Sequence, residues 1–187
     1  MLVAGSVVAA APESLWERLR AVAEPRALVT PERLRAAVPE HIQLVGPARI
    51  AYLHRPLTAP AGLERIDSPS DPRLQPLRAR VTAEEWEHAN LAAAEVPIFA
   101  ALVAGELAAA AGFERLDGRV AHLGVLADPR RRGRGLARRA SHASAAHAQA
   151  MGLLPQWQTL AANTPALDIA ESLGFEPFAV TLSARLE

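Results

Sequence analysis

The spacing of hydrophobic and polar residues predicts a chain in which short helices and strands alternate. Apolar residues recur at helical intervals in two short segments, residues 12–24 and 30–38. Two β-like runs follow, at residues 41–45 and 48–53. Gly46-Pro47 lies between these two runs, so the sequence predicts a hairpin at this point.

The second part of the chain shows a change of period. Thr82-Ala83-Glu84-Glu85 is a capping box and predicts a helix that continues to about residue 94. Three β-like runs are separated by Ala104-Gly105 and Asp117-Gly118, which predicts an antiparallel meander. These runs and the elements after them are strands at 98–103, 106–116 and 119–127, a helix at 136–151, a strand at 154–161, a helix at 165–173 and a strand at 175–186.

A proline-rich segment divides the chain. Residues 56–76 contain several prolines, and few residues of such a segment are expected to join a sheet or a helix. We therefore predict an N-terminal α/β domain with a proline-rich linker over residues 1–72, and a second domain over residues 73–187.

Composition and charge exclude several classes of protein. Arg and Lys together number 20, as do Asp and Glu, so the chain has no global field to hold nucleic acid or an anionic membrane. The absence of cysteine excludes disulfides and thiolate metal sites. No apolar run approaches the ~20 residues that a membrane span needs. Residues 2–11 lack the basic start of a signal peptide and are expected to form a buried strand, and we predict a cytoplasmic protein.

The most informative segment is Asp128-Pro-Arg-Arg-Arg-Gly-Arg-Gly-Leu-Ala137, between a predicted strand and a predicted helix. Gly133 and Gly135 allow a tight turn and a close approach of the backbone to a ligand, and the free amides of the helix start favour an anion. Six arginines between residues 130 and 139 add local positive charge. The segment therefore indicates a cradle for a diphosphate.

Two common phosphate loops do not fit this segment. A Walker loop requires a lysine, and the chain contains none. The dinucleotide fingerprint requires a third glycine, where this chain has Arg138. From the spacing alone, a solvated arginine-rich helix start or a nucleic-acid patch stays open as an alternative.

The residues around this loop resemble the GNAT superfamily of N-acetyltransferases. Arg130-x-x-Gly133-x-Gly135 after a strand ending in Asp128-Pro129 looks like motif A of that superfamily. Asn163, followed by Ala166 and by Leu173-Gly174-Phe175, is similar to its second signature, N-x-x-A-x-x-x-Y-x-x-x-G-F. The resemblance covers roughly residues 73 to 187. It implies a central mixed, mainly antiparallel sheet flanked by helices, preceded by a small α/β domain.

The resemblance also implies a function, acetyl-CoA-dependent transfer of an acetyl group directly to a primary amine of a small molecule, an amino acid or a peptide. In that superfamily the CoA diphosphate lies on the amides of the loop and the pantetheine arm on the preceding strand and on the Asn side chain. The residues placed at the cofactor site are Val125, Leu126, Ala127, Arg130, Arg131, Arg132, Gly133, Arg134, Gly135, Leu136, Ala137 and Asn163. Asn163 fits equally the role of a helix cap.

His122 is the candidate general base. An amine is mostly protonated at neutral pH, so a base must remove its proton, and histidine titrates in the useful range. His122 lies on the central strand, where the alternative is a satisfied core histidine. Backbone amides near Leu126 are expected to hold the developing oxyanion.

One position departs from the family pattern. The tyrosine that often protonates the leaving thiolate is Ala170 in this chain, and the one tyrosine, Tyr52, is assigned to the N-terminal unit. Ser172, water or unassisted departure of the thiolate are the alternatives. The departure also keeps open a CoA-binding regulatory or degenerate protein without efficient turnover.

The acceptor site and the partners are less defined by the sequence. Glu85 and Trp86 are the candidate substrate residues, with a core position as the alternative for Trp86. His142 and His147 are five residues apart, which does not suit a metal pair on one helix face, so no metal is predicted. We expect an amine substrate, no membrane partner and no nucleic acid, and a homodimer stays open.

Overall fold

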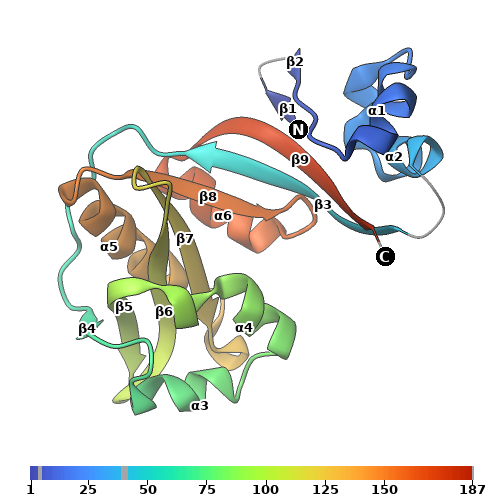
Figure 1. The fold of residues 1–187 in the computed structure, drawn as a ribbon. Coiled ribbons are helices and arrows are strands. Elements are labelled where there is room, and N and C mark those ends of the chain that lie inside the picture. Colours follow the sequence, from blue (N-terminus) through green and yellow to red (C-terminus); the bar gives the residue numbers. More distant parts are fainter. Residues whose placement is uncertain (4–5, 39–41, 187) are drawn as a thin grey trace. The chain divides into compact units, whose positions relative to one another are not determined.

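A computed structural model describes residues 1–3, 6–38 and 42–186 (Figure 1). Backbone contacts divide the chain into two compact units. The first comprises Met1–Ala51, Gln158–Asp168 and Glu176–Glu187, and the second comprises Tyr52–Trp157 and Ile169–Phe175. His41, the first residue of the strand predicted at 41–45, lies outside the described residues. Whether residues 1–72 and 73–187 are separate domains stays a prediction.

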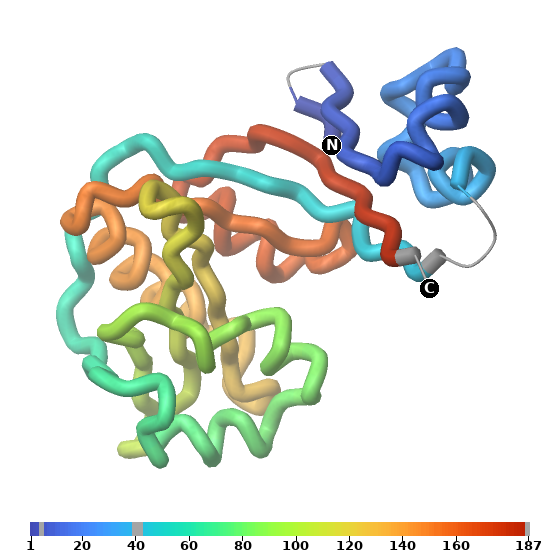
Figure 2. The backbone as a smooth tube through the Cα atoms, viewed as in Figure 1, coloured from blue at the N-terminus to red at the C-terminus, as the bar shows by residue number. Residues whose placement is uncertain are grey.

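The first unit contains a set of strands beside short helices. Its elements are β1 (Leu2–Val3), β2 (Ser6–Val7), α1 (Glu13–Arg20), the 3-10 helix η1 (Pro25–Val29), α2 (Pro31–Ala37), β3 (Ile42–Tyr52, whose last residue belongs to the second unit) and β9 (Glu176–Leu186). The strand order is β2-β1-β9-β3, and Figures 1 and 2 show β3 and β9 as two long neighbouring strands. Leu2–Val3 and Ser6–Val7 are two short strands that are half-buried to exposed, so the single buried strand expected at 2–11 is wrong.

The hairpin predicted at Gly46-Pro47 is also wrong, because β3 runs through both residues as one strand. Gly46 has φ +116°, and a Cβ there would lie 2.9 Å from the Thr181 carbonyl oxygen of β9. The Pro47 carbonyl accepts a hydrogen bond from the Ala161 amide at 2.8 Å. The glycine therefore serves a close approach between neighbouring strands and does not reverse the chain.

The second unit is built on the predicted meander. Its strands are β4 (Glu64–Ile66), β5 (Glu95–Val103), β6 (Glu106–Leu116), β7 (Val120–Ala127) and the first part of β8 (Leu154–Leu160), hydrogen-bonded in the order β4-β5-β6-β7-β8. Only the β7–β8 pair is parallel among these described pairings. Together with the helices on the sheet, this confirms the predicted mixed, mainly antiparallel fold.

The helix α5 (Leu136–Ala150) packs against β5, β6 and β7 through small side chains. Every buried residue of α5 is alanine or serine, and Ala108 to Ala111 of β6 are fully buried. Such side chains allow the helix to lie close to the sheet, which fixes where the helix begins. The next helix, α6 (Thr164–Leu173), runs from the first unit into the second and ends at Gly174.

The other side of the sheet is covered by short helices. They are the 3-10 helix η2 (Pro72–Leu74), α3 (Gln75–Arg78), α4 (Ala83–Ala89) and the 3-10 helix η3 (Leu91–Ala93). Thr82 and Glu85 form the predicted capping box, but α4 ends at Asn90, which has φ +47°, and not at residue 94. The proline-rich segment contains more regular structure than its prolines predict, because β4 pairs with β5 and Ile66 and Leu74 are buried in the core.

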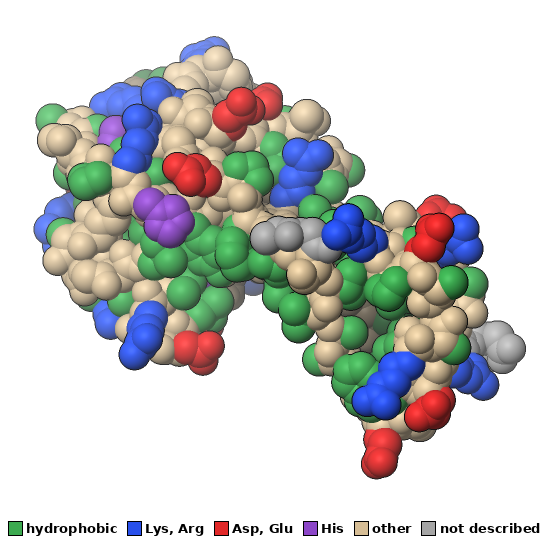
Figure 3. All heavy atoms as spheres, turned by 90° about the horizontal axis from the view of Figure 1, so that it is seen from above, with side chains coloured by type: hydrophobic (Ala, Val, Ile, Leu, Met, Phe, Trp, Pro, Cys, Tyr) green, Lys and Arg blue, Asp and Glu red, His purple; other side chains and the backbone are tan. Residues whose placement is uncertain are grey.

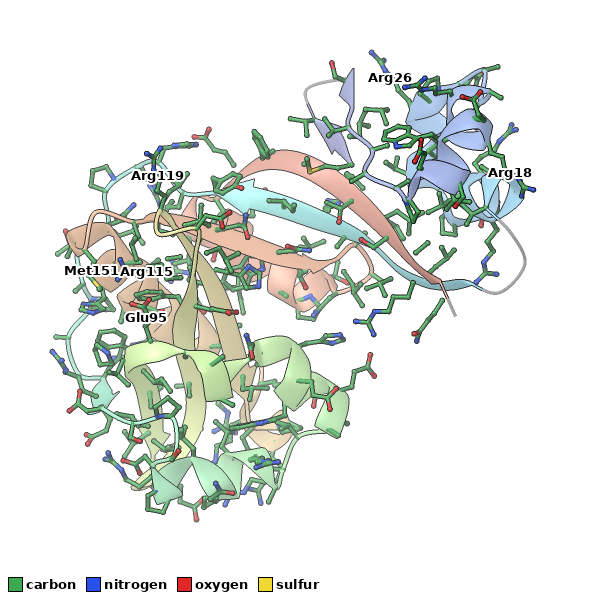
Figure 4. All side chains as sticks on the ribbon, viewed as in Figure 1. Arg18, Arg26, Glu95, Arg115, Arg119 and Met151 are labelled. Atoms are coloured by element: carbon green, nitrogen blue, oxygen red, sulfur yellow. The ribbon has the colours of Figure 1, made fainter. Side chains whose placement is uncertain are left out.

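Side chains on the surface of both units mix polar and apolar types. Figure 4 shows Glu95 of β5 beside Arg115 of β6, and their two hydrogen bonds measure 2.8 and 2.9 Å. Hydrophobic side chains also reach the surface of each unit (Figure 3). In the first unit these include Val45, Leu160 and Phe178.

Candidate active site

The loop between β7 and α5 has the geometry of an anion cradle. After β7 the chain forms the 3-10 helix η4 (Pro129–Arg131), and Gly133 and Gly135 then adopt φ +75° and +72° before α5 begins at Leu136. A Cβ at either glycine would have nothing within 4 Å, so the space beside the loop is open. The first amides of α5 have no partner within the helix, and the helix dipole favours negative charge at this end.

A buried carboxylate fixes the start of this loop. Asp128 is fully buried and accepts hydrogen bonds from the Arg130 amide at 3.0 Å and from its guanidinium at 2.8 and 3.1 Å. Arg80, next to α3, adds an ion pair at 3.2 Å. Arg130 above all, and also Arg80, hold the pKa of Asp128 well below its usual range. Asp128 is therefore charged at neutral pH and anchors the loop to Arg80 within the second unit.

A second carboxylate extends this anchor. Glu106, at the start of β6, accepts from Arg80 at 3.1 Å and from Arg131 at 3.0 Å. The Arg131 guanidinium also donates to the Val103 carbonyl oxygen at 2.6 Å. The arginines after β7 therefore hold the loop against the β5–β6 turn.

The other arginines of the loop and helix are also largely engaged. Arg132 donates to Glu85 at 2.6 Å, Arg138 to the Ser172 hydroxyl at 3.0 Å and Arg139 to the Ala61 carbonyl at 3.1 Å. Arg134 is exposed and has no hydrogen bond or ion pair with the described part of the chain. Most arginines of this segment are therefore hydrogen-bonded within the protein and help to hold the loop.

The predicted cofactor residues of β7 lie on a partly unpaired strand. Within the described ranges, β7 pairs with β8 only from Val120 to His122, while its pairing with β6 continues to Ala127. The backbone of Val125, Leu126 and Ala127 therefore has a strand neighbour on one side only among these residues. Such an edge offers amides and carbonyls to a ligand.

His122 lies in a row of polar side chains across the sheet. It is opposite Glu114 of β6 and Gln156 of β8 in the strand register. Its Nδ1 is 3.0 Å from the Gln156 Oε1, and Glu114 accepts from the Asn90 amide group at 2.8 Å. His122, Glu114 and Asn90 line one crevice at the end of α4, which is too narrow to hold a water molecule.

The end of α4 is pressed onto β7 beside this crevice. A Cβ on Gly124 would lie 1.8 Å from the Ala89 carbonyl oxygen, so only glycine permits the contact. The cross-strand partner of Gly124 is Gly112, another position without a side chain. The two glycines therefore let α4 and η3 approach the sheet next to His122.

The predicted acceptor residues have different surroundings. Glu85 caps α4 and bonds Arg132, and the Thr82 amide followed by Arg132 holds the pKa of Glu85 below its usual range. Trp86 is half-buried, lies under the Arg78 guanidinium at 5.2 Å and lines a hollow of about 450 Å³ between α3 and α4. The carboxylate of Glu85 is thus already neutralised, whereas Trp86 borders open space.

The second signature forms the start and end of α6. The Asn163 Oδ1 accepts from the Ala166 amide at 3.3 Å, which is the capping role expected for this residue. Its role toward the pantetheine arm stays a prediction. Ala170 is buried, and the Ser172 hydroxyl donates to the Ile169 carbonyl while accepting from Arg138.

The two histidines of α5, His142 and His147, are partly buried. His147 packs against Phe99 and Phe113 with ring centroids 5.6 and 6.2 Å apart, and burial lowers its pKa. Burial also lowers the pKa of His142. Within the described ranges no cluster of three or more His, Asp or Glu side chains is arranged to hold a metal ion. In the same ranges no helix combines the length and the apolar character of a membrane span.

Comparison with known proteins agrees with this geometry. The sequence matches the Acetyltransferase (GNAT) family over residues 62–175, and the chain therefore belongs to this family. It is a GNAT acetyltransferase, and the family implies acetyl-CoA as the acetyl donor. The sequence matches no curated protein.

Solved structures show the same fold at low identity. A GNAT-family protein from Novosphingobium aromaticivorans is 23% identical with a TM-score of 0.62, over 78% of this chain and 67% of that one. A GNAT-family acetyltransferase from Colwellia psychrerythraea is 18% identical with a TM-score of 0.59, over 78% of this chain and 57% of its own length. A GCN5-related N-acetyltransferase-like protein from Streptococcus suis is 14% identical with a TM-score of 0.55, over 83% and 67%.

The sequence pattern does not show the contacts of several residues of the site. The roles of Asp128, Glu114, Asn90 and Gln156 depend on contacts between separate strands and helices. Tyr52, expected in the N-terminal unit, is instead the first residue of the second unit, and its hydroxyl oxygen accepts a hydrogen bond from Gln156 at 2.7 Å. One signal was available, because Glu114 and His122 belong to one predicted hairpin and lie nearly equidistant from its turn.

Proposed function

We propose that this chain transfers the acetyl group of acetyl-CoA directly to a primary amine of a small molecule, an amino acid or a peptide. The observation that carries the proposal is the loop before α5, where two left-handed glycines leave open space beside the helix start. The loop is held by a buried, fully paired Asp128, so its shape is formed before any ligand binds. Membership of the GNAT family supports the same conclusion.

The residues present fit the parts of acetyl-CoA. The amides of residues 131–136 would hold the diphosphate, and the exposed Arg134 side chain would add a charged contact. The backbone of Val125, Leu126 and Ala127 would hold the pantetheine arm along the half-paired edge of β7. Asn163 is proposed as a further contact from its place in the second signature, and Gly133, Gly135 and the arginines at 130–132 as the frame of the cradle.

Acetyl-CoA supplies an acetyl thioester, whose carbonyl carbon is open to attack by a neutral amine. In the proposed mechanism His122 accepts the proton that the amine must lose, and the Glu114 carboxylate opposite it attracts the cationic amine toward His122. A backbone amide near Leu126 donates to the charge that develops on the carbonyl oxygen. The absence of cysteine excludes a thioester intermediate on the enzyme.

The position of the usual tyrosine carries no proton donor. Ala170 is buried, and the Ser172 proton is already donated to the Ile169 carbonyl. We therefore propose that the thiolate leaves unassisted or with a proton from water, since a thiolate is an acceptable leaving group near neutral pH. The acceptor enters near α4, where Trp86 borders the hollow and Glu85 holds Arg132.

The test is calorimetric titration with acetyl-CoA, with CoA and dephospho-CoA as comparators. Gly135→Glu should abolish binding, because it places bulk and negative charge in the cradle. Gly152→Glu is the matched control: Gly152 lies just beyond the other end of α5, with φ +74° and equally open space, so its backbone strain is similar. Equal loss in both variants, or unchanged affinity in Gly135→Glu, would remove the site assignment.

Three associated proposals have their own measurements. Thiol release over a panel of amines identifies the acceptor, and acetyl-CoA binding without turnover over that panel would instead favour a CoA-binding regulatory protein. Sedimentation velocity tests the homodimer, and the first unit has exposed apolar side chains at Val45, Leu160 and Phe178. A cytoplasmic location stays a prediction.

A further inference from the structure

A hydrogen-bonded chain of three side chains leads away from His122. Gln156 of β8 lies beside His122 in the parallel β7–β8 register, and its Oε1 is 3.0 Å from the His122 Nδ1. The Gln156 Nε2 donates to the Tyr52 hydroxyl oxygen at 2.7 Å. All three residues belong to the second unit, although Tyr52 and Gln156 are 104 residues apart in the sequence.

This arrangement defines which ring nitrogen of His122 carries the proton. The amide nitrogen of Gln156 is directed at Tyr52, so the amide oxygen is directed at His122. An amide oxygen only accepts hydrogen bonds, so Nδ1 of a neutral imidazole must be the donor. The lone pair then lies on Nε2, the nitrogen that does not face Gln156.

We propose that Gln156 is a positioning residue, which holds His122 in the Nδ1–H tautomer and leaves Nε2 as the proton acceptor, and that Tyr52 fixes the orientation of the Gln156 amide. This rests on the proposed role of His122 as the base. Gln156 is buried, with 7% of its surface exposed, so its amide has few competing water partners and its orientation is strongly restricted.

A neutral amide suits this position better than a carboxylate would. Gln156 directs the ring through one hydrogen bond without adding a negative charge that favours imidazolium. Ionisable side chains near His122 include Glu114 across β6–β7 and, beyond Gln156, Tyr52. Glu114 bonds Asn90, so the amide contact to the Nδ1 comes from Gln156.

The experiment measures the tautomer of His122 by imidazole nitrogen chemical shifts in the full chain, at a pH where the ring is neutral. The His122 signal is assigned by its loss in His122→Asn, since the chain contains six histidines. The wild type should show the Nδ1–H form. Gln156→Leu, which lacks an acceptor, should give a mixture or the other tautomer, and Gln156→Glu, which keeps an acceptor toward Nδ1, should restore the Nδ1–H form.

Tyr52→Phe provides a second variant that leaves Gln156 in place. It removes the acceptor of the Gln156 Nε2, so the amide can turn and the tautomers should mix. An Nε2–H wild type overturns the proposal, as do Gln156→Leu and Tyr52→Phe proteins that fold and keep the wild-type tautomer.

Turnover separates this proposal from the function on which it rests. If His122 is the base, Gln156→Leu should lower kcat by roughly 10-fold or more, within the about 10²- to 10⁴-fold contribution of a general base. The KM for acetyl-CoA should stay unchanged, because Gln156 does not belong to the cradle. A shifted tautomer with wild-type kcat would confirm the positioning by Gln156 and overturn the role of His122 as the base.

Discussion

Replacement of Gly124 by alanine tests whether the contact between α4 and β7 shapes the crevice beside His122. The new Cβ would lie 1.8 Å from the Ala89 carbonyl oxygen, which is 1.6 Å less than the 3.4 Å of ordinary contact. The obstacle is backbone, so no rotation of a side chain relieves it. The end of α4 must move away from β7, and the Asn90–Glu114 hydrogen bond of 2.8 Å moves with it.

Overpacking of this kind costs about 1–3 kcal/mol of the free energy of unfolding. For a chain of this size, 1 kcal/mol shifts Tm by about 2–4 °C, so we expect Tm to fall by roughly 2–12 °C. Thermal unfolding by calorimetry measures this loss. Because the crevice opens, kcat should also fall, whereas acetyl-CoA affinity should change less, since the loop is anchored separately by Asp128.

Gly112→Ala is the matched control, because Gly112 is the cross-strand partner of Gly124. Its Cβ would lie 2.8 Å from the Ala94 Cβ and 3.3 Å from the Ile98 Cγ1, so its shortest contact is 1.0 Å longer than the one at Gly124. We expect a smaller loss of Tm than in Gly124→Ala. A Gly124→Ala protein with wild-type Tm and kcat, or a larger loss in Gly112→Ala, would refute the reasoning.

Two further substitutions probe the loop and the base. Asp128→Asn removes the charge that Arg130 neutralises, so Tm and acetyl-CoA affinity should both fall at pH 7. The folded pKa of Asp128 is depressed, so its stabilisation is present above the unfolded pKa of about 4 and is lost as the pH falls through the folded pKa. The difference in Tm between Asp128→Asn and wild type should therefore narrow below about pH 4, and a constant difference down to pH 2 would contradict this. Glu95→Gln is the control. It removes a charge from an ion pair elsewhere on the sheet and should leave acetyl-CoA affinity unchanged. His122→Ala should lower kcat by about 10²- to 10⁴-fold with acetyl-CoA affinity unchanged, because the variant lacks the side chain that accepts the amine proton. The exposed His88→Ala serves as the control for His122→Ala, and a wild-type kcat and pH profile in His122→Ala would return His122 to a core role.

Several elements whose signals lie within a few residues were predicted well, although the hairpin at Gly46-Pro47 was not. The capping box at Thr82 and Glu85 forms as expected, and α5 ends at Ala150 before Gly152. The loop glycines at 133 and 135 adopt the left-handed conformation that their pattern indicated. These features depend on hydrogen bonds and dihedral preferences of neighbours in the chain, which the sequence displays directly.

The register between neighbouring strands was harder to predict from the sequence. Asp117 and Gly118 form the predicted turn, with φ +48° and +70°, but β7 begins one residue later than expected, at Val120. The pairing of Leu116 with Val120 brings Glu114 opposite His122, whereas a strict two-residue loop would have brought Ala121 there. One residue of shift thus decides whether the carboxylate and the imidazole share a face.

The sequence by itself determined the class of protein, because the two glycines after a strand and the second signature carry the GNAT family pattern. Only the tertiary structure joined Asp128 to Arg80, His122 to Gln156, and Gln156 to Tyr52. These contacts connect residues 34 to 104 positions apart. Their geometry depends on how strands pair and helices pack, and a local pattern of residues carries no record of which distant partner completes a hydrogen bond.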